Sequence, residues 1–269
     1  MKNRTVAIVG CGAIGRAIAK AFSDGRLPGR VTAVCDLRPE AAERLAASIR
    51  PVPHITTVEG AVRAASVVVE CASVNAVDPV VRAAARHRRD VVVMSEIGLM
   101  GHPELFDVVR RAGISMAVPS GALAGLDALR AASGAKLKSV KLTTRKPPAG
   151  LESAPYVVRR GINLRGLKKP LILYNGNVIG AAKGFPANIN VAAGCALAGI
   201  GPKATRVCII ADPTTTVNSH TLEYEGEFGR AVCRIENRPF PENPKTSYLA
   251  ALSAISALRR MLEGIGIGG

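Results

Sequence analysis

Short apolar runs alternate with helical segments through the first 120 residues of the chain. The run at 5–9 ends in glycines, and the segment 13–22 then has the spacing of an amphipathic helix. A second apolar run at 31–35 ends at Asp36 and precedes an alanine-rich segment at 39–49. These segments predict a strand–helix–strand unit with a further helix after it.

The same alternation continues to residue 120. The further predicted strands are 54–57, 67–70, 91–94 and 114–118, and the further predicted helices are 59–65, 77–86 and 102–111. Strands that alternate with helices of this length are typical of a parallel sheet with right-handed crossovers. The fold class predicted for 1–120 is therefore α/β, a Rossmann-type doubly wound parallel sheet.

The pattern changes after residue 120. The predicted helices there are 123–132 and 190–199, and the predicted strands are 140–145, 207–211, 220–226 and 230–236. Strands bounded by Gly, Pro or Asn suit an antiparallel or mixed sheet, so 121–241 is predicted to be a second, smaller α+β domain. A periodic helix is predicted at 245–262, and we expect the segment 242–269 to return to the first domain.

The formal net charge of +16 raises the question of nucleic acid or membrane partners. The basic clusters are short and scattered, and aromatic residues are 3% of the chain with no Trp, so platforms for base stacking are scarce. No apolar run approaches the length of about 18 residues that a membrane helix needs. We therefore expect neither partner, and interpret the charge as a solvated, arginine-rich surface. The alternative is a positive field that attracts anionic small molecules.

Six cysteines lie far apart without a C-x-x-C pair. This spacing suggests neither a zinc site nor a redox dithiol, and no metal is predicted. The cysteines are typical of small buried residues in a reducing compartment, so the expected location is the cytoplasm.

The glycine loop Gly10-Cys11-Gly12-Ala13-Ile14-Gly15 follows a predicted strand and opens a predicted helix. In a dinucleotide-binding turn, Gly10 permits the tight turn, Gly12 lets the backbone approach the pyrophosphate, and Gly15 lets helix and strand pack closely. The helix N-terminus then receives the phosphates. A purely structural glycine turn is the alternative. The cofactor residues predicted from this loop are Gly10, Gly12, Ala13, Ile14 and Gly15.

Asp36 ends the second predicted strand, 21 positions after Gly15 (36 minus 15). Its carboxylate would accept hydrogen bonds from the ribose hydroxyls and repel a 2′-phosphate, which favours NAD. Arg38 could instead pair with that phosphate, which favours NADP. These two residues therefore do not decide between NAD and NADP.

His220 is the candidate acid and base among four histidines, because it begins a strand in the second predicted domain. The alternative is that His220 is a structural residue at the end of a strand, with its ring hydrogen-bonded to backbone groups. Arg145 and Lys146 end another strand in a loop stiffened by prolines, where a cation could bind a carboxylate. As a bare charge pair they would be solvated surface. Asn188 and Asn190 flank a predicted helix start, where Asn is also a favoured cap, and Lys245 lies in a predicted helix start at 243–246.

Together these segments resemble the L-aspartate dehydrogenase family over nearly the whole chain. The matching blocks are the glycine loop, Pro119-Ser120-Gly121-Ala122-Leu123-Ala124-Gly125-Leu126-Asp127, Thr144-Arg145-Lys146-Pro147, Asn188-Ile189-Asn190-Val191-Ala192-Ala193, Asn218-Ser219-His220 and Glu242-Asn243-Pro244-Lys245-Thr246-Ser247. The resemblance implies reversible oxidative deamination of L-aspartate with NAD or NADP, to iminoaspartate or to oxaloacetate and ammonia. The iminoaspartate can feed NAD biosynthesis.

The resemblance also assigns residues. It implies that His220 is catalytic and that Ala124 and Asn190 contact the cofactor. The candidates to hold the small dicarboxylic substrate are Arg145, Lys146, Asn188 and Lys245. The chain departs from the family at Glu96, which follows Ser95 where small residues are usual.

Three further expectations follow. The resemblance to the family implies that this chain forms a homodimer. A dehydrogenase or imine reductase of the same fold acting on another small amino acid is the nearest alternative. A non-catalytic NAD-binding sensor is the alternative from a different class, and it would make His220 dispensable.

Overall fold

The computed structural model describes residues 4–186, 189–240 and 243–266. The chain divides into two compact units. The first unit is formed by Met1–Pro119 and Ala250–Ile267, and the second unit by Ser120–Leu249. No helix in the described part of the chain is long and apolar enough to cross a membrane.

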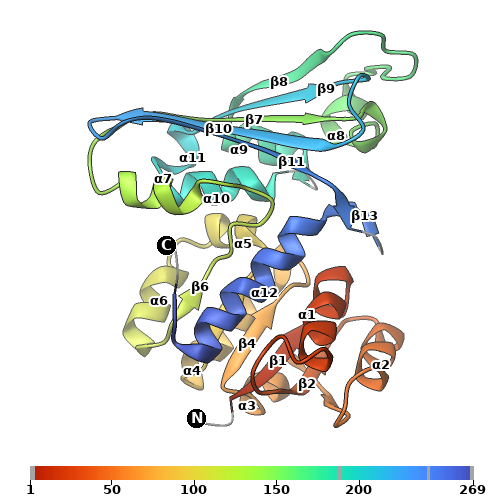
Figure 1. Cartoon of the computed structure of the whole chain (residues 1–269), viewed down its shortest axis with the longest axis vertical. Helices are drawn as coiled ribbons and strands as arrows, with labels where there is room; N and C mark the ends of the chain where they lie inside the picture. The colour runs from red at the N-terminus through yellow and green to blue at the C-terminus, as the bar shows by residue number, and fades with distance from the viewer. Residues whose placement is uncertain (1–3, 187–188, 241–242, 267–269) are drawn as a thin grey trace. The chain divides into compact units, whose positions relative to one another are not determined.

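The first unit contains a six-stranded sheet with the order β3-β2-β1-β4-β5-β6 (Figure 1). Its strands are β1 (Thr5–Val9), β2 (Arg30–Cys35), β3 (His54–Ile55), β4 (Val67–Glu70), β5 (Asp90–Val93) and β6 (Met116–Ala117). Every neighbouring pair is parallel. The strand order reverses beside β1, as in the doubly wound dinucleotide-binding fold, so the predicted fold class is confirmed.

Helices connect these strands. They are α1 (Ala13–Ser23), α2 (Pro39–Ala47), α3 (Val58–Arg63), α4 (Val77–Arg86), α5 (Glu96–Gly101) and α6 (Leu105–Ala112), with a 3-10 turn η1 at Val74–Ala76. The predicted helix at 102–111 is shorter than expected, because His102 ends α5 and α6 begins only at Leu105. Helix α5 was not predicted, since its six residues are too few to show a period.

The hydrophobic core of the first unit includes residues from both ends of the chain. Ile8 of β1 and Ile18 of α1 pack in one cluster with Leu258 of α12 (Tyr248–Glu263). Each such side chain contributes about 1.5–3 kcal/mol when it is fully removed from water. The final helix is therefore part of the first unit's core.

The start of that helix differs from the prediction. Residues 245–247 belong to strand β13 (Asn243–Ser247), which pairs with β12 (Pro239–Phe240), and the helix begins at Tyr248. The Tyr248 N–H donates to the carbonyl of Arg238 at 3.0 Å. The helix start predicted at 243–246 is therefore wrong, because the strand pairing that decides this segment is not visible in the local sequence.

The second unit contains a five-stranded mixed sheet with the order β11-β10-β7-β9-β8. Its strands are β7 (Leu137–Lys146), β8 (Leu171–Asn177), β9 (Arg206–Ala211), β10 (Asn218–Gly226) and β11 (Gly229–Asn237). Strands β7 and β9 are parallel, and the other pairs are antiparallel. Strand β8 was not predicted, because it lies at the sheet edge with Leu171 and Ile172 exposed and shows no alternation.

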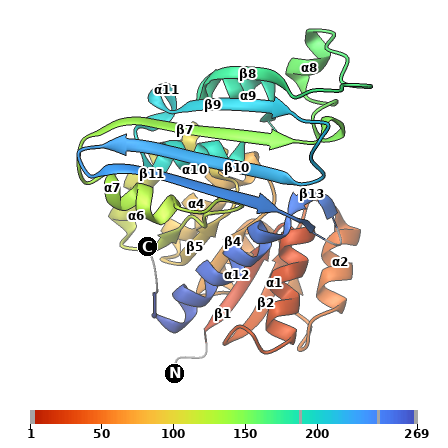
Figure 2. The same cartoon turned by 45° about the horizontal axis from the view of Figure 1, so that its top comes forward.

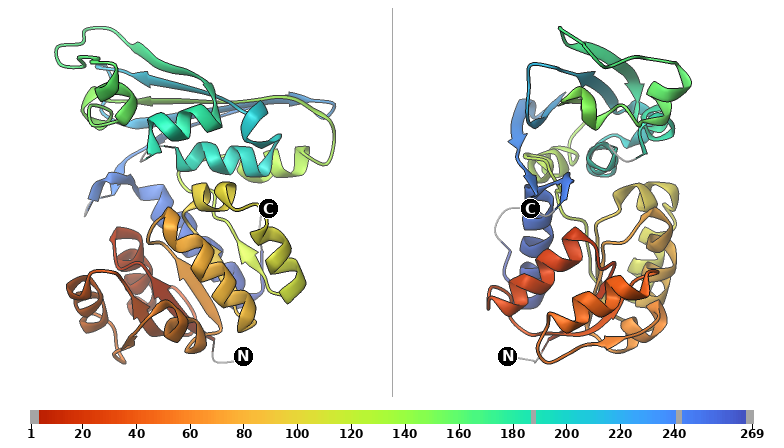
Figure 3. Two further views of the ribbon diagram at one scale, coloured as in Figure 1. Left: turned by 180° about the vertical axis from the view of Figure 1, so that it is seen from behind. Right: turned by 90° about the vertical axis from the view of Figure 1, so that its right-hand side faces the viewer.

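Helices cover one face of this sheet (Figures 2 and 3). They include α7 (Leu126–Ala132), α9 (Val178–Gly184), α10 (Asn190–Ala198) and α11 (Gly201–Ala204), and the short α8 (Pro155–Arg159) precedes β8. Helix α7 begins three residues later than predicted, because Gly125 has a φ of +78°. The strand alternation decides which side chains point to the helices: Val140 and Leu142 of β7 and Leu222 of β10 are fully buried there. We call this side the covered face and the other side the open face.

Candidate active site

The glycine loop has the backbone that a dinucleotide-binding turn requires. Gly10 has a φ of +105°, and a Cβ there would lie 2.5 Å from the carbonyl carbon of Cys71. A Cβ on Gly15 would collide with the Gly10 carbonyl oxygen. A Cβ on Gly12 would meet nothing within 4 Å. Gly10 and Gly15 thus serve the turn and its packing, whereas the space beside Gly12 is open to a ligand.

Helix α1 begins directly at this open space. Its N-cap is Gly12, no side chain among the described residues caps it, and its first turn, which includes Ala13 and Ile14, carries no acidic residue. The first N–H groups of a helix have no partner within the helix, and the helix dipole favours an anion there. The loop therefore fits the pyrophosphate of a dinucleotide.

Asp36 follows β2 and is joined to the glycine loop by hydrogen bonds. Its Oδ2 accepts from the Cys11 N–H at 2.7 Å, and its Oδ1 accepts from the Arg38 N–H at 2.9 Å. Burial raises the pKa of Asp36, but the backbone hydrogen bonds from Arg38 and Cys11 outweigh it and hold the pKa below its ordinary value. The Arg38 side chain is 70% exposed, and its Nε lies 3.5 Å from the Asp36 carboxylate. A carboxylate held by backbone hydrogen bonds and an exposed cation thus lie together at the end of β2, where the sequence predicted the contact with the adenosine ribose.

A buried carboxylate that was not predicted as a site residue lies at the same edge of the sheet and accepts hydrogen bonds from the loops there. Glu70 ends β4, and its Oε1 accepts hydrogen bonds from the N–H groups of Ala72 and Ser73. Ser95, after β5, donates its hydroxyl to Oε1 and its N–H to Oε2, both at 3.0 Å. Burial raises the pKa of Glu70 despite these donors. The sequence pattern that could have indicated Glu70 is the one that indicated Asp36: an acidic residue at the end of an apolar strand.

Glu96, where the chain departs from its resemblance, is the first residue of α5 and is buried in the first unit. Its carboxylate is therefore enclosed at the end of β5 and is not a surface charge.

His220 lies on the covered face of the second unit's sheet and is 3% exposed. It is directly opposite Thr144 of the neighbouring strand β7, and its Nδ1 lies 3.0 Å from the Thr144 Oγ1. Burial, and then the charge of Lys146, lower the pKa of His220 to about 3. The imidazole is therefore neutral near pH 7 and is held at one nitrogen.

Lys146 lies two residues beyond Thr144 on β7, which places it on the same face of the strand. Burial lowers the pKa of Lys146 to about 8, so the ammonium group is charged at neutral pH. Its positive charge adds to the effect of burial in lowering the pKa of His220. A cation and a neutral base therefore lie together on the covered face.

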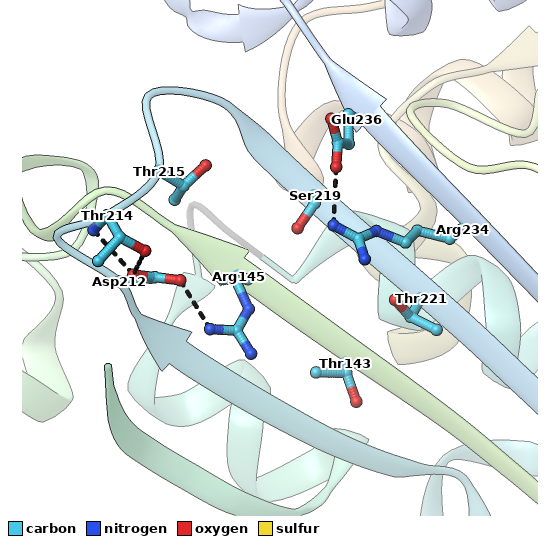
Figure 4. A pocket seen from close by; sticks show the side chains of 9 residues that line it. All are labelled: Thr143, Arg145, Asp212, Thr214, Thr215, Ser219, Thr221, Arg234 and Glu236. Atoms are coloured by element: carbon cyan, nitrogen blue, oxygen red, sulfur yellow. Dashed lines mark hydrogen bonds and ion pairs between the residues drawn. The ribbon is translucent and has the colours of Figure 1, made fainter. Parts of the chain in front are cut away.

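Arg145 lies on the open face, away from His220. Its Nη1 forms an ion pair with Oδ2 of Asp212 at 2.6 Å, and hydrogen bonds from Thr214 and Arg145 hold the pKa of Asp212 below its ordinary value. Figure 4 shows this pair in a polar pocket of about 450 Å³. The pocket is lined by Thr143, Arg145, Asp212, Thr214, Thr215, Ser219, Thr221, Arg234 and Glu236. The structure thus does not bring Arg145 together with His220. Asp212 was missed in the sequence, although it directly follows β9, the strand beside β7.

Ala124 lies in the turn before α7. Two side chains of the sheet form hydrogen bonds with the backbone of this turn. Asn237 of β11 donates from Nδ2 to the Ala122 carbonyl at 2.9 Å, and the Tyr224 hydroxyl of β10 donates to the Gly125 carbonyl at 3.4 Å. Neither side chain was predicted to act on this turn.

Asn190 is the first residue of α10, which packs against α7 and β7. Asn188 lies outside the described residues. Lys245 lies in β13, but its side chain is outside the described part of the structure.

One group of possible metal ligands lies elsewhere in the first unit. Asp78, His102 and Glu104 have ligand atoms within 4.8 Å of one another. The Arg82 guanidinium already contacts both carboxylates, at 2.7 Å from Asp78 and 3.0 Å from Glu104. The positive charge of Arg82 therefore already offsets part of the negative charge of these two carboxylates.

Two family models match the chain. The model described as aspartate dehydrogenase, C-terminal, matches residues 127–261, and the model described as homoserine dehydrogenase, NAD binding domain, matches residues 10–119. The L-aspartate dehydrogenase of Methanosarcina acetivorans is 45% identical over 98% of both chains. That of Bradyrhizobium diazoefficiens is 42% identical over 98% of this chain and 93% of its own.

The chain belongs to the L-aspartate dehydrogenase family. Among solved structures, the aspartate dehydrogenase of Thermotoga maritima is 25% identical, with a TM-score of 0.75, over 98% of this chain and 99% of its own. A homoserine dehydrogenase from Thiobacillus denitrificans is 12% identical with a TM-score of 0.63, which shows a shared fold alone. The family predicted from the sequence blocks is confirmed, and so is a nicotinamide cofactor for this L-aspartate dehydrogenase family member.

Proposed function

We propose that this chain is an L-aspartate dehydrogenase that oxidises L-aspartate with NAD or NADP to iminoaspartate, which water converts to oxaloacetate and ammonia. The observation that carries the proposal is the neutral, buried imidazole of His220 on the same sheet face as the partly buried cation Lys146. A base and a carboxylate-binding cation are the two groups that deamination of an acidic amino acid needs. Family membership supports the same reaction.

The first unit holds the cofactor in this proposal. The open space at Gly12 and the N-terminus of α1 receive the pyrophosphate, and Asp36 and Arg38 face the adenosine ribose. Ala124 and Asn190 are further proposed cofactor contacts, carried over from the resemblance. When bound, the nicotinamide supplies the acceptor for the hydride that leaves the substrate Cα.

His220 moves the protons. Because its imidazole is neutral, it accepts a proton from the substrate ammonium group and so provides the amine whose lone pair forms the imine. After the hydride has left, the imidazolium releases that proton to solvent, and the same ring nitrogen accepts a proton from the water that attacks the iminium carbon. The ring passes this proton to the carbinolamine nitrogen, and as ammonia departs it takes the proton of the carbinol hydroxyl, which leaves the carbonyl of oxaloacetate. A substrate carboxylate beside the ring favours the imidazolium and raises its pKa towards the working range.

Lys146 holds a substrate carboxylate. Its ammonium group is partly removed from water, so its attraction for a carboxylate is stronger than it would be at the surface. Arg145 is also a candidate from the sequence, but its pairing with Asp212 on the open face favours Lys146 for this role.

The deciding experiment is a panel of L-amino acids with NAD⁺ and NADP⁺, and of 2-oxo acids with ammonia and the reduced cofactors, followed by absorbance. We expect aspartate and oxaloacetate to be the preferred pair. A preference for another small amino acid would favour the alternative dehydrogenase, with the buried Glu96 as the first residue to test. Tight cofactor binding without turnover would favour the sensor.

His220→Ala is expected to lower kcat by about 10²- to 10⁴-fold, the usual contribution of an acid–base residue. The matched control is His54→Ala, because His54 is an exposed histidine of the first unit. Full aspartate-dependent activity in His220→Ala would overturn the assignment.

The proposal also includes a homodimer in the cytoplasm, with no nucleic acid or membrane partner. The mass in solution, measured by light scattering, tests the dimer, and a monomer at working concentrations would contradict it.

A further inference from the structure

Thr144 of the second unit forms a hydrogen bond with the ring of His220. The two residues lie opposite each other on antiparallel strands, and both are almost completely buried, at 2% and 3% exposure. Directly opposite residues share one face of a sheet, and here the Thr144 Oγ1 lies 3.0 Å from His220 Nδ1. The neighbouring residue Thr143 faces the other way and lines the pocket on the open face.

We propose that Thr144 is a positioning residue that keeps the proton of His220 on Nδ1, so that Nε2 is the atom that exchanges protons with the substrate. This inference rests on the proposed function. An imidazole that acts through Nε2 carries a proton on Nδ1 both as the neutral base and as the imidazolium. In both forms the Nδ1–H donates to the Thr144 oxygen, so one hydrogen bond serves the whole proton cycle.

The hydroxyl is suited to this role by its chemistry as well as its position. It is an uncharged acceptor, so it fixes the tautomer without stabilising the imidazolium as strongly as a carboxylate would. The imidazole therefore stays neutral between turnovers and is ready to accept a proton. In metal sites, partners that orient a ligating histidine typically change metal affinity or activity by about 10–100-fold when they are removed, and we expect an effect of the same size here.

The test compares Thr144→Val with Thr144→Ser. Val keeps the shape and removes the hydroxyl, and Ser keeps the hydroxyl and removes the methyl group. We expect kcat to fall by about 10–100-fold in Thr144→Val, with KM for aspartate changed by less than about 3-fold, and to return to within about 3-fold of the wild type in Thr144→Ser. Thr143→Val is the matched control, with the same chemical change on the open face, and should leave kcat unchanged.

A second measurement follows the ring itself. With ¹⁵N-labelled histidine, and His220 assigned by its loss in His220→Ala, NMR reports which ring nitrogen carries the proton. We expect Nδ1–H in the wild type and in Thr144→Ser, and a shift towards Nε2–H in Thr144→Val. If Thr144→Val does not fold, Thr144→Ala replaces it in both measurements.

Three results would overturn the inference: Nε2–H in the wild type, an unchanged kcat in Thr144→Val, or a Ser variant as impaired as the Val variant. The spectrum is recorded without substrate. It therefore still tests Thr144 if the amino-acid panel shows that aspartate is not the substrate.

Discussion

Two adjacent cations on β7 have opposite environments, and this difference decides their roles at the scale of single residues. Arg145 on the open face is already paired with Asp212. Lys146 on the covered face is partly buried, and its pKa is lowered to about 8. A partly buried ammonium group gains more from a bound carboxylate than a surface guanidinium that has its own counter-ion. This comparison supports the proposal that Lys146 binds the substrate.

Lys146→Met should raise KM for aspartate by about 10–100-fold, because a hydrogen bond to a charged group contributes about 1.5–3 kcal/mol. In the wild type, KM should rise as the pH increases through about 8, since the ammonium group then loses its proton. Steady-state kinetics from pH 6 to 10 check both, and the pH dependence should disappear in Lys146→Met. A larger increase of KM in Arg145→Gln than in Lys146→Met would contradict the assignment.

The sequence could indicate both cations but could not choose between them. Strand alternation places consecutive residues on opposite faces, so one of the two had to face away from His220. Which one it is depends on the register of β7 against β10, where His220 is opposite Thr144. Register is set by pairing between strands 76 residues apart, and the local sequence does not record it.

At the scale of elements, the strand–loop–helix unit that opens the chain follows from local chemistry. The glycine positions, the apolar run before them and the helical spacing after them predict the turn without any distant contact. The elements that were missed depend on distant partners: β13 exists through its pairing with β12, and β8 through its pairing with β9. Local pattern was therefore sufficient for the parallel sheet and insufficient for the edges of the mixed sheet.

Two glycines of the loop should respond differently to the same change. In Gly12→Ala the new Cβ enters open space at ordinary φ, so the fold should be kept while NAD(P) binding weakens by about tenfold or more, or about 1.4 kcal/mol. In Gly15→Ala the new Cβ meets the Gly10 carbonyl, so the protein itself should be destabilised by about 1–3 kcal/mol. Calorimetric titration with the cofactor and thermal unfolding without it separate the two effects. Equal losses of stability would show that the space beside Gly12 is not reserved for a ligand.

At the scale of the whole molecule, the proposed roles are divided between the units. The first unit supplies a preformed anion site, braced by the carboxylates of Asp36 and Glu70. The second unit supplies a buried base and a partly buried cation, and loss of hydration shifts the pKa of each in the direction that disfavours its charged form. Such groups make the stability of the folded chain depend on pH.

The sign of that dependence follows from proton uptake. Below about pH 6.5 the unfolded chain protonates His220, whereas the folded chain keeps it neutral down to about pH 3. The free energy of unfolding is therefore not reduced by His220 at a pH above the pKa of the unfolded chain. It decreases as the pH falls from there towards the pKa of the folded chain, by up to about 1.4 kcal/mol per pH unit. His220→Gln removes this proton from the balance and leaves the other groups in place. We expect thermal midpoints between pH 7 and 4 to fall less steeply in His220→Gln than in the wild type. Parallel curves would mean that the imidazole of His220 is already accessible to protons in the folded state.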